Sequence, residues 1–145
     1  MSTTNEQPIP QGKYLAAVRN ADLIYTSGMT PRKSGKLLYS GKIQMKDPID
    51  SNRESVRLAT SNALTAAMVC LKEGEKISLI LQLTVYLNTE DGFTAHAKIA
   101  DFASEYLIET LGANSIGSRA AIGVASLPSN APVEISLVGQ VVSSN

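Results

Sequence analysis

The sequence predicts an α+β fold in which one mixed β-sheet carries two helices on a single face. Two segments have apolar residues at helical spacing, and several shorter segments are typical of strands. Their order is strand, strand, helix, strand, helix, strand, strand. Helices that cross over between strands of one sheet are expected on the same face. The 145 residues suit one domain spanning 1–145, with residues 1–11 as a loose N-terminal arm.

The N-terminal part predicts a β-hairpin and then a basic stretch. Residues 15–19 and 23–28 flank the turn residues Asn20, Ala21 and Asp22. Residues 31–48 are rich in Gly, Lys and Ser, and a short strand at 37–39 fits this stretch. Its basic residues are Arg32, Lys33, Lys36, Lys42 and Lys46. Such a cluster is more often a solvated loop than a specific anion site.

The two helices are predicted at about 51–72 and 93–111. Ser51-Asn52-Arg53-Glu54 has the spacing of a capping box, and Gly74 suits the end of the first helix. Cys70 lies on the apolar stripe of this helix, which favours a packed thiol over a nucleophile. Gly112 is expected to close the second helix.

Residues 77–87 predict the central strand, because apolar residues alternate along it. Ile77, Leu79, Leu81, Leu83, Val85 and Leu87 are expected on one face, with Ile80 on the other. The last two strands run from about 119 to 127 and from 132 to 141. With both helices on one face, the other face of the sheet is bare, which predicts an oligomer interface.

The composition excludes several classes of protein. Lys plus Arg and Asp plus Glu both total 13, so nucleic acid is not an expected partner. Cys70 is the only cysteine, so no internal disulfide can form. The N-terminus lacks the features of a signal peptide, and no apolar run is long enough for a bilayer. We therefore expect a cytoplasmic protein with no membrane partner.

His96, the only histidine, cannot build a protein-only zinc site, so no metal is expected and His96 is predicted to be a surface residue.

Arg119 and Glu134 are the candidate catalytic residues. Arg119 begins a strand of small apolar residues, and such strands are typically buried. A guanidinium fixed at the start of a buried strand is suited to bind a carboxylate ligand. An arginine that pairs with a neighbouring carboxylate is the alternative interpretation. Glu134 is the only carboxylate of the last strand. It is either a proton shuttle with a pKa raised by burial, or a solvent-facing residue of an alternating strand.

Four segments, in order, together resemble the Rid family, also called YjgF/YER057c/UK114. They are Tyr25-Thr26-Ser27-Gly28 before Pro31, Leu83-Thr84-Val85-Tyr86-Leu87, Arg119 before Ala121-Ile122-Gly123-Val124-Ala125-Ser126-Leu127-Pro128, and Ala131-Pro132-Val133-Glu134-Ile135. The match covers about residues 12–142 and looks closer to a less characterised branch than to the best-known deaminases. The resemblance implies a chorismate-mutase-like fold and a homotrimer with sites between subunits.

The resemblance also implies a chemistry. Archetypes of the family hydrolyse 2-imino or enamine acids to 2-oxo acids and ammonia. Imine hydrolysis needs a positioned carboxylate, a water and a proton-transfer group, so no metal or organic cofactor is expected. By resemblance, Arg119 holds the substrate carboxylate, Glu134 lies near the attacking water, and Tyr14, Ser27 and Gly28 line the cleft. This chain departs from the family at two places. Ala121 stands where many deaminases of the family have a cysteine. An asparagine that is common in the family's second helix aligns near Ala100 or Asp101, and neither residue has its amide group.

Other functions remain open at this level. A non-catalytic trimeric protein that binds a small carboxylate is the main alternative to the deaminase. Ribonuclease or translation-inhibitor activity, named for some relatives, is disfavoured by the neutral charge and the lack of an aromatic and basic surface.

A register argument predicts that the site is shared between subunits. A hairpin connection at Pro128-Ser129-Asn130-Ala131 would put Glu134 opposite Ala125, which is six residues from Arg119. That spacing is roughly 20 Å along a strand, too far for both side chains to contact one small substrate. Arg119 of one subunit is therefore expected to meet Glu134 of another.

Overall fold

The computed structural model describes residues 6–144, in which five strands form one mixed sheet in the order β1-β2-β7-β5-β6. The strands are β1 (Ala17–Asn20), β2 (Leu23–Thr26), β5 (Glu75–Asn88), β6 (Ile116–Val124) and β7 (Val133–Ser143). Only β5 and β6 pair in parallel, across the connection that contains the second helix. The predicted mixed sheet is thereby confirmed.

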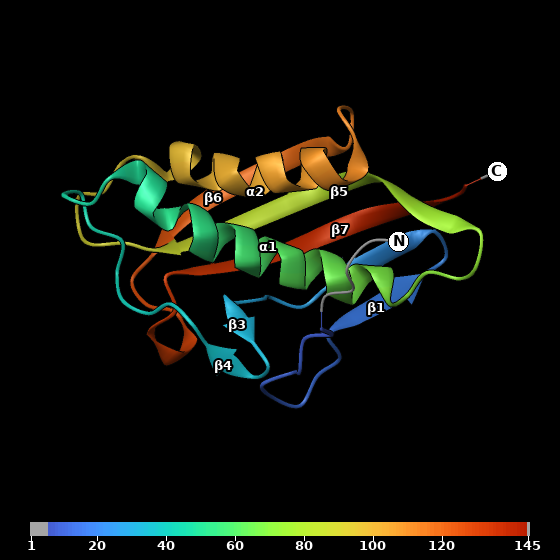
Figure 1. Cartoon of the computed structure of the whole chain (residues 1–145), viewed down its shortest axis with the longest axis horizontal. Helices are drawn as coiled ribbons and strands as arrows, with labels where there is room; N and C mark the ends of the chain where they lie inside the picture. Colours follow the sequence, from blue (N-terminus) through green and yellow to red (C-terminus); the bar gives the residue numbers. More distant parts are fainter. Residues whose placement is uncertain (1–5, 145) are drawn as a thin grey trace.

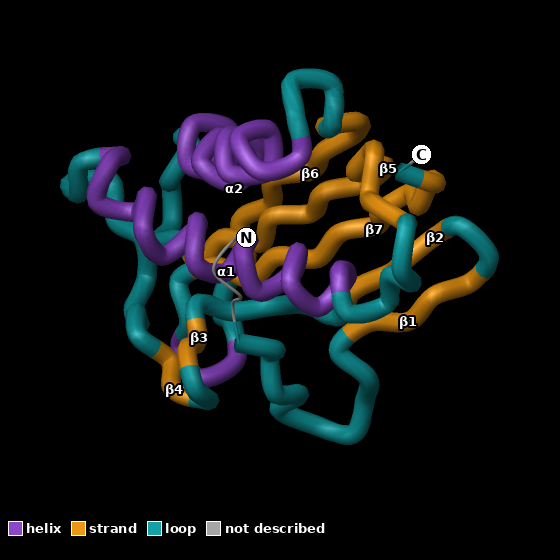
Figure 2. Tube along the Cα trace, turned by 45° about the vertical axis from the view of Figure 1, so that its right-hand side comes forward, coloured by secondary structure: helices purple, strands orange, loops and turns teal. Residues whose placement is uncertain are grey.

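Both helices cover the same face of this sheet. Helices α1 (Arg53–Met68) and α2 (His96–Leu111) lie next to each other in front of the strands (Figure 1). In the turned view of Figure 2 both helices again lie on this one side of the strands. The predicted arrangement of the helices is therefore correct. No helix within residues 6–144 has the length and apolar content needed to cross a bilayer.

The buried side chains lie between the helices and the sheet. Alternate residues of β7, starting at Val133, are buried against the helices, whereas the residues between them are half-buried on the other face. The corresponding helix residues are mostly small, and Ala59, Ala63, Ala100 and Ala103 are fully buried. Alanines at these positions let helix and sheet backbones approach closely.

The prediction of strict alternation along β5 is wrong in the middle of the strand. Register shifts relative to β7 occur between Ile77 and Leu79 and between Ile80 and Gln82. Each bulge adds one residue and so reverses which face the next side chain occupies. As a result Ile80 is fully buried against the helices, and Leu79 and Leu81 are only half-buried.

The predicted hairpin between the last two strands is also wrong. β5 lies between β6 and β7, so Glu134 pairs with Tyr86 and not with Ala125. β6 is an edge strand, and its residues are half-buried or exposed where its small apolar residues predicted burial. The 3₁₀ turn η2 (Pro128–Asn130) lies in the connection between the two strands.

Smaller elements differ from prediction at their ends. The 3₁₀ turn η1 (Ile49–Asn52) precedes α1, and the Ser51 hydroxyl donates to the Pro48 carbonyl, so the predicted capping box does not form. The predicted strand at 37–39 is part of a two-stranded hairpin, β3 (Arg32–Lys33) and β4 (Lys36–Leu37). Cys70 packs against the core as predicted, and Gly112 follows α2 with a φ of 118°.

A buried asparagine joins the loops at one end of the sheet. Asn88, the last residue of β5, is fully buried. Its amide nitrogen donates to the Ala131 carbonyl at 3.0 Å and to the Asn130 side chain at 3.2 Å, and its Oδ1 accepts from Lys42 at 3.0 Å. One side chain thus connects the central strand to the 42–43 loop and to the connection that precedes β7.

We expect Asn88→Leu to lower the free energy of unfolding by about 2–4 kcal/mol, because leucine leaves buried groups of two loops without partners. Urea denaturation measures the change. Asn114→Leu alters an exposed turn residue and is the matched control, expected to change stability by less than about 0.5 kcal/mol. Equal effects of the two substitutions would show that the Asn88 contacts do not stabilise the fold.

Candidate functional site

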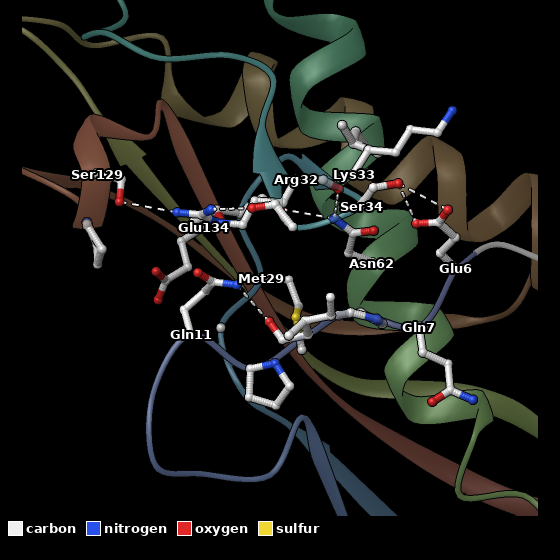
Figure 3. A pocket seen from close by; sticks show the side chains of 18 of the residues that line it. Glu6, Gln7, Gln11, Met29, Arg32, Lys33, Ser34, Asn62, Ser129 and Glu134 are labelled. Atoms are coloured by element: carbon white, nitrogen blue, oxygen red, sulfur yellow. Dashed lines mark hydrogen bonds between the residues drawn. The ribbon is translucent and has the colours of Figure 1, made fainter.

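A cavity of about 370 Å³ lies where the N-terminal arm, the β3–β4 hairpin and the first residues of β7 meet. Figure 3 shows its side chains, with Glu134, Arg32 and Ser129 at one end. Glu134, Tyr14 and Gly28, three of the predicted site residues, line this cavity. The structure therefore brings together residues that are far apart in the sequence.

Glu134 packs directly on Gly28. A Cβ built on Gly28 would lie 2.2 Å from a carboxylate oxygen of Glu134 and 2.6 Å from its carboxyl carbon. No side chain larger than hydrogen fits there unless Glu134 moves. Gly28 thus sets the position of the Glu134 carboxyl group.

An interruption of the β2–β7 ladder creates this contact. Pairing stops at Tyr25 with Val138 and resumes with two hydrogen bonds between Met29 and Ile135, of 2.7 and 2.8 Å. Ser27 lies in the interrupted segment, and its hydroxyl donates to the Leu15 carbonyl at 2.6 Å. Ser27 therefore holds the segment that leads to β1 and is not among the residues lining the cavity. Irregular pairing of this kind is common beside binding sites.

The Glu134 carboxyl group is half-buried, and burial raises its pKa above the ordinary value of 4.5. Among the described residues, no cation lies within ion-pair distance of it. A carboxyl group in this environment can exchange protons nearer to neutral pH than an exposed glutamate can.

Tyr14, in the segment between the N-terminal arm and β1, contributes to the cavity wall. Its phenolic oxygen accepts a hydrogen bond from the Gln11 backbone at 3.1 Å, and its side chain remains partly exposed. Tyr14 and Gln11 thus belong to the side of the cavity that the chain before β1 forms, together with residues 6–10 of the N-terminal arm.

Arg119 lies elsewhere. It pairs with Leu83 on the helix-covered face, and its guanidinium donates to Asp101 at 2.7 Å and to Ser104 at 3.0 Å. Glu134 pairs with Tyr86 and lies on the other face of the sheet. Three residues along the strand and two strand spacings separate the two positions, about 10 Å in each direction. Within one chain, Arg119 and Glu134 do not converge.

Comparison with known proteins identifies the family. A family model described as "YjgF/chorismate mutase-like, putative endoribonuclease" matches residues 7–141. The chain belongs to the YjgF/Rid family.

The similar proteins match this YjgF/Rid chain along most of its length. The crystal structure of Atu1372 from Agrobacterium tumefaciens superposes with a TM-score of 0.83 at 27% identity, covering 94% of this chain and 86% of that one. Protein TCP17 of Trypanosoma cruzi is 23% identical over 87% of this chain and 79% of its own length. E. coli TdcF, solved with bound serine, has a TM-score of 0.62 at 20% identity, with 97% and 95% coverage.

One charged residue lining the cavity of this YjgF/Rid protein, Arg32, was not predicted as a site residue from the sequence. Arg32 was assigned to a solvated basic stretch, but it is half-buried and lines the cavity together with Glu134. Ser34 and Gly35, with φ values of 55° and 78°, form the turn of the β3–β4 hairpin that holds it. The Ser34-Gly35 pair could have indicated this hairpin from the sequence, because a tight hairpin turn typically has positive φ at both of its central residues. A hairpin here would have placed Arg32 in a strand and not in a loop.

The described residues contain no group of three or more potential ligands that could hold a metal ion. His96 is half-buried at the start of α2 and contacts Phe93 edge-on, with ring centroids 5.2 Å apart. It is therefore a packed residue and not the surface residue expected.

We expect Glu134→Gln to stabilise this YjgF/Rid protein at neutral pH. A carboxyl pKa that is higher in the folded than in the unfolded chain makes the free energy of unfolding fall as pH rises from 4.5 through the folded-state pKa. Glutamine cannot ionise and removes this loss, so the variant should be more stable at pH 7 and nearly equal to the wild type below about pH 4.

Urea denaturation at the two pH values measures the difference. Glu73→Gln changes an exposed glutamate and controls for the loss of a negative charge. A Glu134→Gln protein that is less stable than the wild type at pH 7 would contradict the assigned effect of burial.

Proposed function

We propose that this protein hydrolyses 2-imino or enamine acids to 2-oxo acids and ammonia, using Glu134 as the proton-transfer group. The observation that carries the proposal is the half-buried Glu134 carboxyl group, set against Gly28 in a cavity of about 370 Å³. Membership of the YjgF/Rid family supports it.

Each step of the proposed reaction includes a proton transfer that Glu134 could carry out. An enamine acid takes a proton on its terminal carbon and becomes the iminium ion, and water then adds to the C=N carbon with loss of a proton. Transfer of a proton to nitrogen lets ammonia leave as the carbonyl forms. A carboxyl group that alternates between protonated and ionised forms can serve these transfers, typically with a 10²- to 10⁴-fold gain in rate.

The proposed active form is a homotrimer in which Arg119 of one subunit binds the substrate carboxylate near Glu134 of another. The location of Arg119 and Glu134 on opposite faces of one sheet supports a shared site, because neither side chain can reach the other within a chain. Arg119 already forms an ion pair with Asp101, so a substrate carboxylate would have to share the guanidinium with Asp101 or displace it. The Asp101 side chain is largely exposed, so it can turn toward solvent.

Catalysis can be tested by generating 2-aminoacrylate with a serine dehydratase and following pyruvate release. The wild type is expected to accelerate release beyond the dehydratase alone, and Glu134→Gln to lose about 10²-fold or more of this acceleration. Arg119→Ala should raise the substrate concentration needed for half-maximal rate, because the carboxylate loses its partner.

Arg57→Ala is the matched control, because Arg57 also pairs with a carboxylate of α2, Glu109 at 3.0 Å, but does not line the cavity. It should leave the rate unchanged. If the wild type releases pyruvate no faster than the dehydratase alone, the proposed activity is wrong. Binding of a 2-oxo acid without turnover would then indicate a binding protein.

A further inference from the structure

Arg32 differs from every other arginine of the chain in its ionic contacts. Within the described residues, each of the others forms an ion pair with at least one carboxylate; they are Arg19, Arg53, Arg57 and Arg119. Arg32 forms none within residues 6–144. A half-buried guanidinium without a carboxylate partner is uncommon, because burying a charge costs free energy unless it is paired.

The contacts of Arg32 hold it in place without neutralising it. One terminal nitrogen donates to the Gly35 carbonyl at 3.0 Å, and the other donates to the Ser129 hydroxyl at 3.2 Å. Its Nε is buried and has no acceptor among the described residues. The acceptors are uncharged, so the guanidinium keeps its full charge and at least one unused donor.

The other charged groups of the cavity do not compensate Arg32. Glu6 accepts hydrogen bonds from the Ser34 hydroxyl and lies on the opposite side of the cavity from Glu134 (Figure 3). Lys33 extends away from Glu134 in the same view. Arg32 is therefore the cation at the Glu134 end of the cavity, where Ser129 also lies.

The cavity is also larger than a small imino acid requires. Its volume of about 370 Å³ falls within the range of about 300–1,000 Å³ that is typical of ligand pockets, and a three-carbon acid fills only part of it. A longer ligand could react beside Glu134 and still reach Arg32 in the same cavity.

From these contacts we infer that Arg32 binds a second anionic group of the ligand, so the site selects small 2-oxo or 2-imino acids with a further carboxylate. The planar guanidinium offers paired donors to a carboxylate, and the contact would supply the missing counter-charge. The proposed function supplies only one part of this inference, namely that the ligand is a 2-oxo or 2-imino acid. The second anionic group follows from the contacts of Arg32.

Two matched 2-oxo acids test the selection. 2-Oxoglutarate and 2-oxopentanoate have the same carbon chain, but only the first ends in a second carboxylate. Titration calorimetry on the full-length protein is expected to show about tenfold or tighter binding of 2-oxoglutarate. Arg32→Leu should abolish this preference by weakening 2-oxoglutarate alone, and Arg32→Lys should keep part of it, because lysine retains the charge without the planar pair of donors.

Lys36→Leu removes an exposed cation of the same hairpin and should leave the preference intact. Thermal unfolding of each variant shows whether loss of the Gly35 and Ser129 contacts disturbs the fold. If Arg32→Leu does not fold, the wild-type preference and its reduction in Arg32→Lys remain as the test.

Three results would overturn the inference: a wild type that binds neither acid, a wild type without a preference, or a folded Arg32→Leu protein that keeps the preference or weakens both acids equally. These outcomes are separate from the deaminase assay. An Arg32-dependent preference without pyruvate release would leave the inference standing and remove the proposed activity. Pyruvate release without the preference would do the reverse.

Discussion

The hydrogen bonds of Asn88 are the constraint on which the cavity depends. Asn88 ends the central strand, and its backbone N–H donates to the Pro132 carbonyl while its carbonyl accepts from Ile43. Its side chain binds Asn130, Ala131 and Lys42. These contacts fix where the connection after β6 crosses the end of the sheet. Ser129 of that connection and Glu134 at the start of β7 both line the cavity, so Asn88 helps to set the positions of both. A fully buried amide can have this role only because its donors and acceptor are all satisfied.

A second constraint acts on the carboxyl group itself. Gly28 lets Glu134 lie flat against the backbone, where it loses water without gaining a charged partner. The raised pKa is the direct result, and it costs stability at neutral pH. A chain that keeps such a group gives up stability that an uncharged side chain would provide, which is common at functional positions.

Features that depend on residues close together in the chain could be predicted from the sequence, whereas features that depend on distant residues could not. The N-terminal hairpin around Ala21 and the end of α2 at Gly112 depend on local turn and cap geometry, and both were predicted. The bulges of β5 depend on its pairing with β7, so the alternating residues 77–87 gave no sign of them. The place of β6 at the sheet edge depends on strand order, which small apolar residues do not encode. Arg32 was missed for the same reason, because its hydrogen bond to Ser129 of the Pro128–Asn130 turn joins positions 97 residues apart.

The faces of the sheet decide which arginine can share a ligand with Glu134. Side chains of a strand cannot cross the sheet, so Arg119, on the helix-covered face, can approach Glu134 only from a second copy of the chain. Arg32 reaches the same cavity from its own hairpin. A ligand held by both arginines would contact two guanidinium groups at different points around Glu134. One carboxylate cannot occupy both, so a shared site of this kind favours a ligand with two anionic groups over one with a single carboxylate.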